Sequence, residues 1–358
     1  MEQSLFVQYI TKFFKGIVLG VTTKLNDSKN ALTYRYKQML RTETSVTGKW
    51  ESFLSDNTFV MADVVAMDSS LPLKMRDSLS KASGNIPKMG QERKLNETQL
   101  TELEVLTAQG QEGPILKRVF EDTPKVITAV YERNEAIFLE GLSTGQALID
   151  DPENIGTGVR VDYGFKTENK FGVTALWSNS STAKPFDDMN RVKKKAKADG
   201  NSIIRVMMDP TAFNNLVATN QAKELYAFKQ GFLGEKVPTP SLDQINTVMS
   251  DRLGFTIEIV ERSVKYERDG VRSAYDPWAT GVAAFITEEI VGTLVTARLA
   301  EESHPVANVT YEKADGYILV SKYRQNRPSL AEFTSSQARC IPVISSEVYL
   351  LNSGEVQA

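Results

Sequence analysis

The sequence predicts an α+β protein with two lobes and flanking extensions. Three observations lead to this fold class. The chain has 358 residues, more than the ~250–300 at which one core stops growing and chains divide into domains. Residues 124–143 place apolar positions at helical spacing, and residues 186–260 alternate helix-like and strand-like segments. With 41% hydrophobic and 24% charged residues, the composition is that of a folded protein.

The first 57 residues predict an N-terminal arm in which a helix precedes polar chain. Lys12 and Lys15 interrupt the apolar residues 5–21, which disfavours a membrane span. The stretch lacks a basic segment before it and a small-residue cleavage site after it, which disfavours a secretory signal, so a helix that packs on a neighbour is expected. Residues 1–50 hold eight Lys and Arg against three Asp and Glu, a net of plus 5, so the remainder carries minus 8 to give minus 3. Lys12 and Lys15 are candidates for contact with DNA or an acidic neighbour, beside the alternative of a solvated helix.

Residues 58–98 predict an extended loop. Large apolar residues are scarce, Gly84, Pro87 and Gly90 lie close together, and the stretch is too long for an ordinary connection. A segment that cannot bury itself is expected to find its partner on another chain. The cationic residues of the loop are the candidates for such contact: Lys74, Arg76, Lys81, Lys88, Arg93 and Lys94.

The longest predicted helix covers residues 124–143, with a preceding turn or two at 114–120. Thr123 offers an N-cap oxygen, and Pro124 suits the first helical position. Downstream, residues 159–165 and 171–177 alternate apolar and polar positions on either side of the turn-forming residues 167–169. This pattern predicts a β-hairpin.

An α/β lobe is predicted from residue 186 onward. Helices over 186–198, 210–216 and 242–252 alternate with strands over 202–208 and 255–260. Asp209 is the expected N-cap of the second helix, and Gly254 ends the third. Further strands are expected at 282–286 and 318–323, and residues 331–351 read as extended chain. The helix over 186–198 carries a basic cluster that could meet DNA phosphate or an acidic neighbour, with a solvated face as the alternative: Arg191, Lys193, Lys194, Lys195 and Lys197.

No sequence pattern predicts catalysis, a cofactor or a metal site. Cys340 is the single cysteine and cannot form an intrachain disulfide, and the single His304 cannot supply paired zinc ligands. Neither a nucleophile elbow nor a phosphate loop is present, and residues 156–158 read as a turn. Cys340 lies in an apolar extended string and is expected to be a buried small hydrophobe. The chain is therefore predicted not to be an enzyme.

Three local strings carry a resemblance to a known family. They are Pro185–Phe186–Asp187–Asp188, the string Met207–Met208–Asp209–Pro210–Thr211–Ala212–Phe213, and Ala331-Glu332-Phe333-Thr334-Ser335-Ser336-Gln337-Ala338-Arg339-Cys340-Ile341-Pro342-Val343. Together with the order of arm, loop, long helix, sheet and α/β lobe, they make the chain from Phe59 onward similar to the lambda-type major capsid proteins of tailed phages, which have the Hong Kong 97 fold.

The resemblance implies a domain organisation. Residues 1–57 would form the N-terminal arm and 58–98 the extended loop. A peripheral domain with a long spine helix and a β-sheet would comprise 99–183 and 305–338, and an axial α/β domain would comprise 184–304 and 339–358.

The resemblance also implies a function. Members self-assemble into hexamers and pentamers of an icosahedral head that encloses double-stranded DNA, so this chain would be a virion protein assembled in the host cytoplasm. At this length a separate scaffolding protein is expected, along with a portal and, as a further candidate, a decoration protein. No membrane partner and no covalent cross-link through the loop lysines are expected. The alternatives are an α/β enzyme with an unrecognised site, or another phage structural protein such as a tube or portal component.

Overall fold

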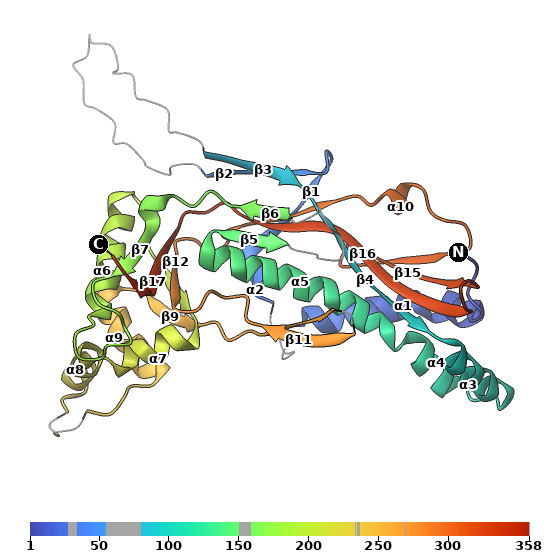
Figure 1. The fold of residues 1–358 in the computed structure, drawn as a ribbon, viewed down its shortest axis with the longest axis horizontal. Coiled ribbons are helices and arrows are strands. Elements are labelled where there is room, and N and C mark those ends of the chain that lie inside the picture. Colours follow the sequence, from blue (N-terminus) through green and yellow to red (C-terminus); the bar gives the residue numbers. More distant parts are fainter. Residues whose placement is uncertain are drawn as a thin grey trace, which may run out of the picture. The chain divides into compact units, whose positions relative to one another are not determined.

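The computed structural model describes residues 1–27, 34–54, 80–149, 159–232, 234, 237–268 and 270–357. Its contacts divide the chain into two units, which Figure 1 colours along the sequence. Unit 1 comprises Met1–Trp50, Gly84–Ala136 and Thr293–Val343, and unit 2 comprises Glu51–Ser83, Ile137–Gly292 and Ile344–Ala358. Within the described ranges, no helix is long and apolar enough to cross a membrane. The candidates Lys74 and Arg76 and the predicted turn at 156–158 lie outside the described residues.

A six-stranded sheet forms the centre of unit 1. Its strands are β1 (Leu40–Ser45), β4 (Lys88–Leu95), β13 (Gly292–Ala297), β14 (Thr310–Ala314), β15 (Ile318–Gln325) and β16 (Ala331–Ile344). They follow the order β1-β13-β16-β15-β14, and β4 also pairs with β16. The β4–β16 register runs antiparallel from Leu95 opposite Glu332 to Lys88 opposite Arg339. The end of the predicted extended loop therefore pairs with a strand of its own chain. The sequence analysis had predicted a partner on another chain.

Helices accompany this sheet. They are α1 (Val7–Asn26), α2 (Arg35–Met39), α3 (Glu97–Ala108), α4 (Glu112–Phe120), α10 (Ala300–Ser303) and the first part of α5 (Asp122–Thr144). The long helix α5 begins at Asp122, one residue before the predicted cap. The prediction that Thr123 is the N-cap is wrong, because its buried hydroxyl finds no partner among the described residues.

The arm forms a helix, α1, as predicted, but this helix packs on its own chain. Ile10, Phe14 and Val18 form its buried face, and these positions recur at helical spacing. The helix lies against β14, and the rings of Phe14 and Phe120 stack with centroids 6.2 Å apart. The expectation that this helix packs on a neighbouring chain is therefore corrected for its buried face.

Unit 2 contains a five-stranded sheet in the order β7-β17-β12-β8-β9. These strands are β7 (Lys170–Val173), β8 (Arg205–Met208), β9 (Thr256–Ile259), β12 (Val282–Ile286) and β17 (Val348–Val356). The pairs β7–β17 and β8–β9 are parallel, and β12 pairs antiparallel with both β8 and β17. The C-terminal strand β17 thus belongs to the sheet of the α/β lobe.

Four helices pack with this sheet: α6 (Pro185–Ala198), α7 (Pro210–Ala218), α8 (Asn220–Gln230) and α9 (Leu242–Leu253). The predicted caps are confirmed. The Asp209 carboxylate accepts the N–H groups of Thr211 and Ala212 at 3.2 Å each, and Gly254 ends α9 at φ +77°. Such a left-handed conformation favours glycine because it has no Cβ.

The predicted hairpin over residues 159–177 is wrong. Its first run becomes β6 (Val159–Asp162), which pairs antiparallel with β5 (Gln146–Ile149). Its second run becomes β7 on the edge of the five-stranded sheet, and the supposed turn is the 3₁₀ helix η1 (Thr167–Asn169). The alternation of apolar and polar residues correctly predicted two strands. It does not indicate which strand each of them pairs with.

Three further short pairings complete the described structure. The strand β2 (Lys49–Leu54) pairs with β3 (Ser80–Asn85), and the ribbon of β10 (Val264–Arg268) and β11 (Val271–Tyr275) stands as a separate two-stranded sheet. Near the N-terminus, Glu2 forms an isolated antiparallel bridge with Arg324.

Candidate functional site

The predicted loop candidates separate into three groups. The side chains of Lys88 and Lys94 on β4 are exposed, and Arg93 between them is partly buried. Lys81 belongs to β3, but its side chain lies outside the described part of the chain. Antiparallel pairing of β4 with β16 fixes the backbone under the first three side chains. These three are therefore presented on a sheet, whereas the prediction placed them on an unsupported loop.

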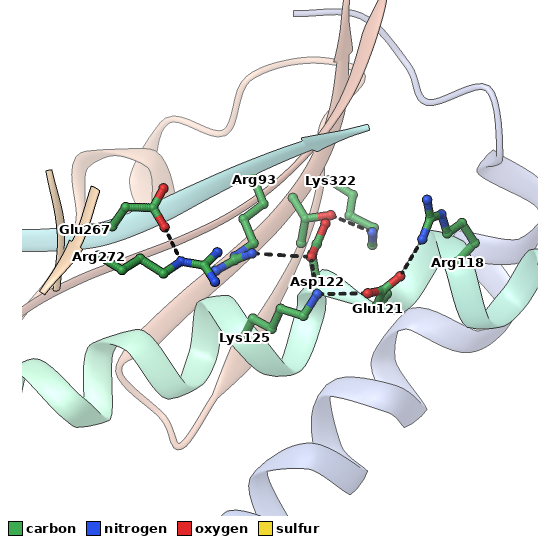
Figure 2. Close-up of polar contacts among 9 residues, drawn as sticks. Arg93, Arg118, Glu121, Asp122, Lys125, Glu267, Arg272 and Lys322 are labelled. Atoms are coloured by element: carbon green, nitrogen blue, oxygen red, sulfur yellow. Dashed lines mark hydrogen bonds and ion pairs between the residues drawn. The ribbon is translucent and has the colours of Figure 1, made fainter. Parts of the chain in front are cut away.

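A chain of alternating charges joins β4 to the start of α5 (Figure 2). Arg93 forms an ion pair with Asp122 at 3.9 Å, Lys125 contacts both Asp122 and Glu121 at 3.0 Å, and Arg118 contacts Glu121 at 3.1 Å. Together with Lys94, Leu95 and Gln99, these residues line a hollow of about 300 Å³.

Each carboxylate of the cluster lies beside two cationic side chains. The hydrogen bond from Lys125 lowers the pKa of Glu121, and the hydrogen bond to Glu121 raises the pKa of Lys125. Because both side chains are 41–42% exposed, solvent screens the pair, and its contribution to stability is small. The chemical capability of this surface is recognition of a charged partner; no described group in it is arranged as an acid–base or nucleophile pair.

A buried lysine lies beside this cluster and was missed by the sequence analysis. Lys322 on β15 is 4% exposed, and its ammonium donates to the Val119 carbonyl and the Thr334 hydroxyl at 2.7 Å each. The same ammonium lies 5.1 Å from the ring centroid of Phe120 and 6.0 Å from that of Phe14. Burial lowers the pKa of Lys322 to about 8. The lysine therefore ties α1, α4 and two strands together.

Asp315 anchors the end of the arm helix. Its carboxylate accepts the Tyr131 hydroxyl at 2.9 Å and the Asn26 side-chain amide at 3.1 Å, and it pairs with Lys37. Burial lowers the pKa of Lys37, an effect that the Asp315 contact partly offsets. Asp315 has φ 54° in the β14–β15 turn, a conformation that Asp tolerates better than most residues. The turn thus holds α1, α2 and α5.

The N-terminus is tied to the same sheet. Arg324 donates to the Glu2 carboxylate at 2.6 Å, and the Leu5 N–H donates to Glu332 at 2.6 Å. Burial raises the pKa of Glu332. The exposed Lys12 and Lys15 lie on α1 away from its buried face, so the two predicted contact residues of the arm remain accessible on a helix whose other face is fixed.

The basic cluster of α6 divides into structural and exposed members. Arg191 donates to the Gly172 carbonyl and lies 3.5 Å from Asp188, and Lys195 contacts Asp199 at 2.6 Å. Lys194 and Lys197 are exposed and Lys193 is partly buried. Among the described residues, no ion pair is found for these last three.

Asp188 explains why the first turn of α6 is fixed. Its side chain is fully buried, and its carboxylate accepts the Thr174 N–H at 3.0 Å, the Thr174 hydroxyl at 2.6 Å and the Trp177 indole N–H at 3.1 Å. A carboxylate buried with several donors is stabilised by them. The motif Pro185–Phe186–Asp187–Asp188 therefore has a structural role, because its last residue links the start of α6 to Thr174 and Trp177.

His304 and Cys340, the only histidine and the only cysteine of the sequence, both lie outside any catalytic arrangement of described residues. His304 is exposed and follows α10 as its C-cap. Cys340 is fully buried, as predicted, beside the Asn134 amide at 3.4 Å, and burial raises its thiol pKa to about 12. Within the described residues, no group of three or more His, Cys, Asp or Glu side chains could hold a metal ion.

Comparison with known proteins gives one family. The family model for phage major capsid protein E matches residues 22–345. No curated protein sequence matches the chain.

Two solved structures show a similar fold. The crystal structure of the proposed capsid protein of a prophage from E. coli CFT073 has a TM-score of 0.57 at 11% identity, and the match covers 94% of this chain and 98% of that chain. The crystal structure of a phage-related protein from Bordetella bronchiseptica RB50 has a TM-score of 0.53 at 13% identity, covering 94% of this chain and 97% of that chain. At such identities the likeness concerns the fold.

Proposed function

The chain belongs to the family of phage major capsid protein E, and on that premise we propose that it self-associates into hexamers and pentamers of an icosahedral head around double-stranded DNA. The protein is a structural capsid protein with the Hong Kong 97-type fold. The single observation that carries the proposal is the family match over residues 22–345. The proposed role is non-enzymatic.

The physics of closed assemblies supports this role. A heterologous contact repeated around a rotation axis closes into a ring, and a contact of ~800 Å² per partner is then used many times. The arm helix, β4 and the charge cluster belong to one unit whose sheet fixes them. We assign Lys88, Arg93 and Lys94 to the contact with a neighbouring copy, with Lys74, Arg76 and Lys81 as further loop members.

The domain roles are part of the proposal. Residues 99–183 with 305–338 would form the peripheral domain, and 184–304 with 339–358 the axial domain around the symmetry axes. Residues 1–57 would serve as the arm and 58–98 as the loop. A scaffolding protein, a portal and a decoration protein are the proposed partners, with assembly in the host cytoplasm.

Packaged DNA is the proposed non-specific partner of the exposed lysines. Lys194 and Lys197 on α6 and Lys12 and Lys15 on α1 are exposed. The partly buried Lys193 belongs to the same proposed contact because it lies on α6 beside Lys194. Arg191 and Lys195 are engaged within the chain, so they contribute charge and hold the helix in place.

The assembly proposal is tested by negative-stain electron microscopy of the purified protein, expressed alone and with its neighbouring phage genes. Six-fold rings, tubes or closed shells are expected. Uniform small particles under every condition would overturn the proposal and favour the α/β enzyme alternative, which a substrate screen would then address.

The DNA proposal is tested by the salt dependence of duplex binding. Each phosphate contact contributes about 0.9 to the slope of log K against log salt, so Lys194→Gln with Lys197→Gln should reduce the slope by about two. The control is Lys49→Gln with Lys117→Gln, which removes the same charge from exposed positions. Equal slopes for the two double variants would show that α6 is not the contact.

A further inference from the structure

The β10–β11 ribbon is a separate two-stranded sheet among the described strands. Its strands pair antiparallel over five residues each, from Val264 opposite Tyr275 to Arg268 opposite Val271. Neither strand pairs with any other described strand. An isolated two-stranded ribbon is at best marginally stable in water. A ribbon of this kind therefore gains order when one of its faces is covered.

The two faces of the ribbon differ in chemistry. Directly opposed residues share a face, and successive residues alternate between faces. The positions of Val264, Tyr266, Val271 and Tyr275 therefore lie on one face, together with those of Arg268 and Ser273 at its far end and centre. The other face carries Lys265, Glu267, Arg272 and Ala274.

The apolar face is open over most of its length. Val264 at its base is 5% exposed, whereas Tyr266, Val271 and Tyr275 are 41%, 65% and 37% exposed. The two tyrosine rings meet edge to face, with centroids 5.9 Å apart and an interplanar angle of 68°. Single exposed apolar residues are ordinary, but three on one face of a ribbon form a patch with a defined shape.

The charges of the ribbon do not favour a polyanion. On the polar face, Arg272 donates to the Glu267 carboxylate at 2.8 Å (Figure 2), and each neutralises the other. The hydrogen bond to Glu267 raises the pKa of Arg272. Residues 264–275 hold three Lys and Arg against two Asp and Glu, a net of plus 1. Phosphate recognition relies on a larger excess of cationic groups, so the ribbon matches an apolar protein surface better than DNA.

The size of the patch identifies the kind of partner. A tyrosine buries roughly 150–250 Å² when fully covered, so the remaining exposed area of two tyrosines and a valine is on the order of 300 Å². A stable pair of proteins needs ~800 Å² from each partner. The patch cannot hold a free partner alone. It suits a neighbour that other contacts already hold, which in a closed shell is a second copy of the same chain.

We propose that the β10–β11 ribbon is a docking element whose aromatic face packs against a second copy of this chain on assembly. The inference rests on the proposed shell-forming function and names a contact that the loop and arm candidates do not include. Because the patch is small, it acts as one of several contacts and tunes the concentration at which assembly begins.

Hydrogen–deuterium exchange of free and assembled wild-type protein tests the docking directly. Amides of residues 264–275 should exchange rapidly in the free subunit and at least about tenfold more slowly after assembly. Slow exchange in the free subunit would mean that the chain covers its own ribbon, and unchanged exchange on assembly would mean that nothing covers it. Slowing only after another phage protein or DNA is added would identify that molecule as the occupant. Each of these three results overturns the inference.

Paired variants separate the aromatic face from the ribbon itself. Tyr266→Thr with Tyr275→Thr keeps β-forming residues and should raise the concentration needed for assembly at least about tenfold, measured by light scattering and microscopy. The control is Lys265→Thr with Ala274→Thr, a directly opposed and exposed pair on the other face, which should assemble like wild type. Equal effects of both pairs would overturn the inference. Failure of wild type to assemble at all would instead overturn the proposed function.

Discussion

Replacement of Lys322 by methionine gives the sharpest test of the described packing. Lys322 is 4% exposed, and its ammonium has two hydrogen-bond acceptors, the Val119 carbonyl and the Thr334 hydroxyl. Burial lowers its pKa from 10.5 to about 8. Methionine has a similar length and no charge, so Lys322→Met removes the titration while filling most of the space.

The sign follows from proton linkage. In the unfolded chain the lysine keeps its proton up to about pH 10.5, whereas in the folded chain it loses the proton near pH 8. Between these values the unfolded state binds more protons, so the free energy of unfolding rises with pH. For those two pKa values, the rise between pH 7 and 9.5 is about 2 kcal/mol, since one pKa unit corresponds to about 1.36 kcal/mol. The wild type should therefore gain about 2 kcal/mol relative to the methionine variant over this range.

Urea unfolding of the unassembled subunit at several pH values, followed by circular dichroism, measures this difference. The control is Lys94→Met, at an exposed lysine in the same unit, which should show a pH profile parallel to that of the wild type. At pH 7 the methionine variant should have a free energy of unfolding close to that of the wild type. Removing the buried charge is favourable, and this gain offsets the cost of leaving two hydrogen-bond acceptors unpaired. Parallel profiles for wild type and Lys322→Met would refute the reasoning, as would a relative loss of wild-type stability with rising pH.

Two further predictions concern packing in the individual units. Gly90→Ala should destabilise unit 1 by at least ~2 kcal/mol in urea unfolding, because its Cβ would lie 2.0 Å from the Ser336 carbonyl oxygen. Gly16→Ala, where nothing lies within 4 Å, should instead stabilise by about 0.5–1 kcal/mol, and the same sign for both changes would contradict this account. Asp188→Ala should cost about 3 kcal/mol and change the fluorescence of Trp177, whose indole N–H it accepts. Asp187→Ala on the exposed side of the same turn should cost less than ~0.5 kcal/mol, and comparable losses from both would show that the buried hydrogen bonds are not the cause.

The elements that were predicted well carry their signals within a few residues. Asp209 precedes Pro210 at the start of α7, and Gly254 follows the last turn of α9, so both ends were readable from local chemistry. The apolar residues 5–21 likewise indicated a helix in the arm, and the structure forms α1 there. Such signals depend on hydrogen bonds and sterics within one turn, and these are set by the sequence alone.

The contacts that were missed join residues far apart in sequence. Lys322 reaches Val119, Asp315 reaches Asn26, and Glu332 accepts the Leu5 amide. For the contact of Lys322 with Val119, the sequence offers one signal, a lysine within the apolar residues of β15. Such a position is notable because the protein interior rarely holds an unpaired charge. Asp188 had no such signal, since its neighbour Asp187 is chemically identical and exposed.

The predicted contact residues illustrate the same limit. Sequence identified the basic cluster of α6, but only its surroundings separate Arg191 and Lys195, which bind within the chain, from the exposed Lys194 and Lys197. On β4, sequence identified Arg93 and Lys94 without the carboxylate of Asp122, which the helix start brings to the same hollow. The interfaces themselves remain predictions, because they require a second copy.

The sequence by itself determined the α+β class, the arm helix, the caps of the α/β lobe, the absence of recognisable catalytic motifs and the resemblance to phage capsid proteins. Tertiary structure decided which strands pair, which lysines are buried and which face of the β10–β11 ribbon stays open. The physical reason is that periodicity and capping act over a few residues. Strand partners and buried charges are selected by the packing of segments from distant parts of the chain, and no local pattern encodes that packing.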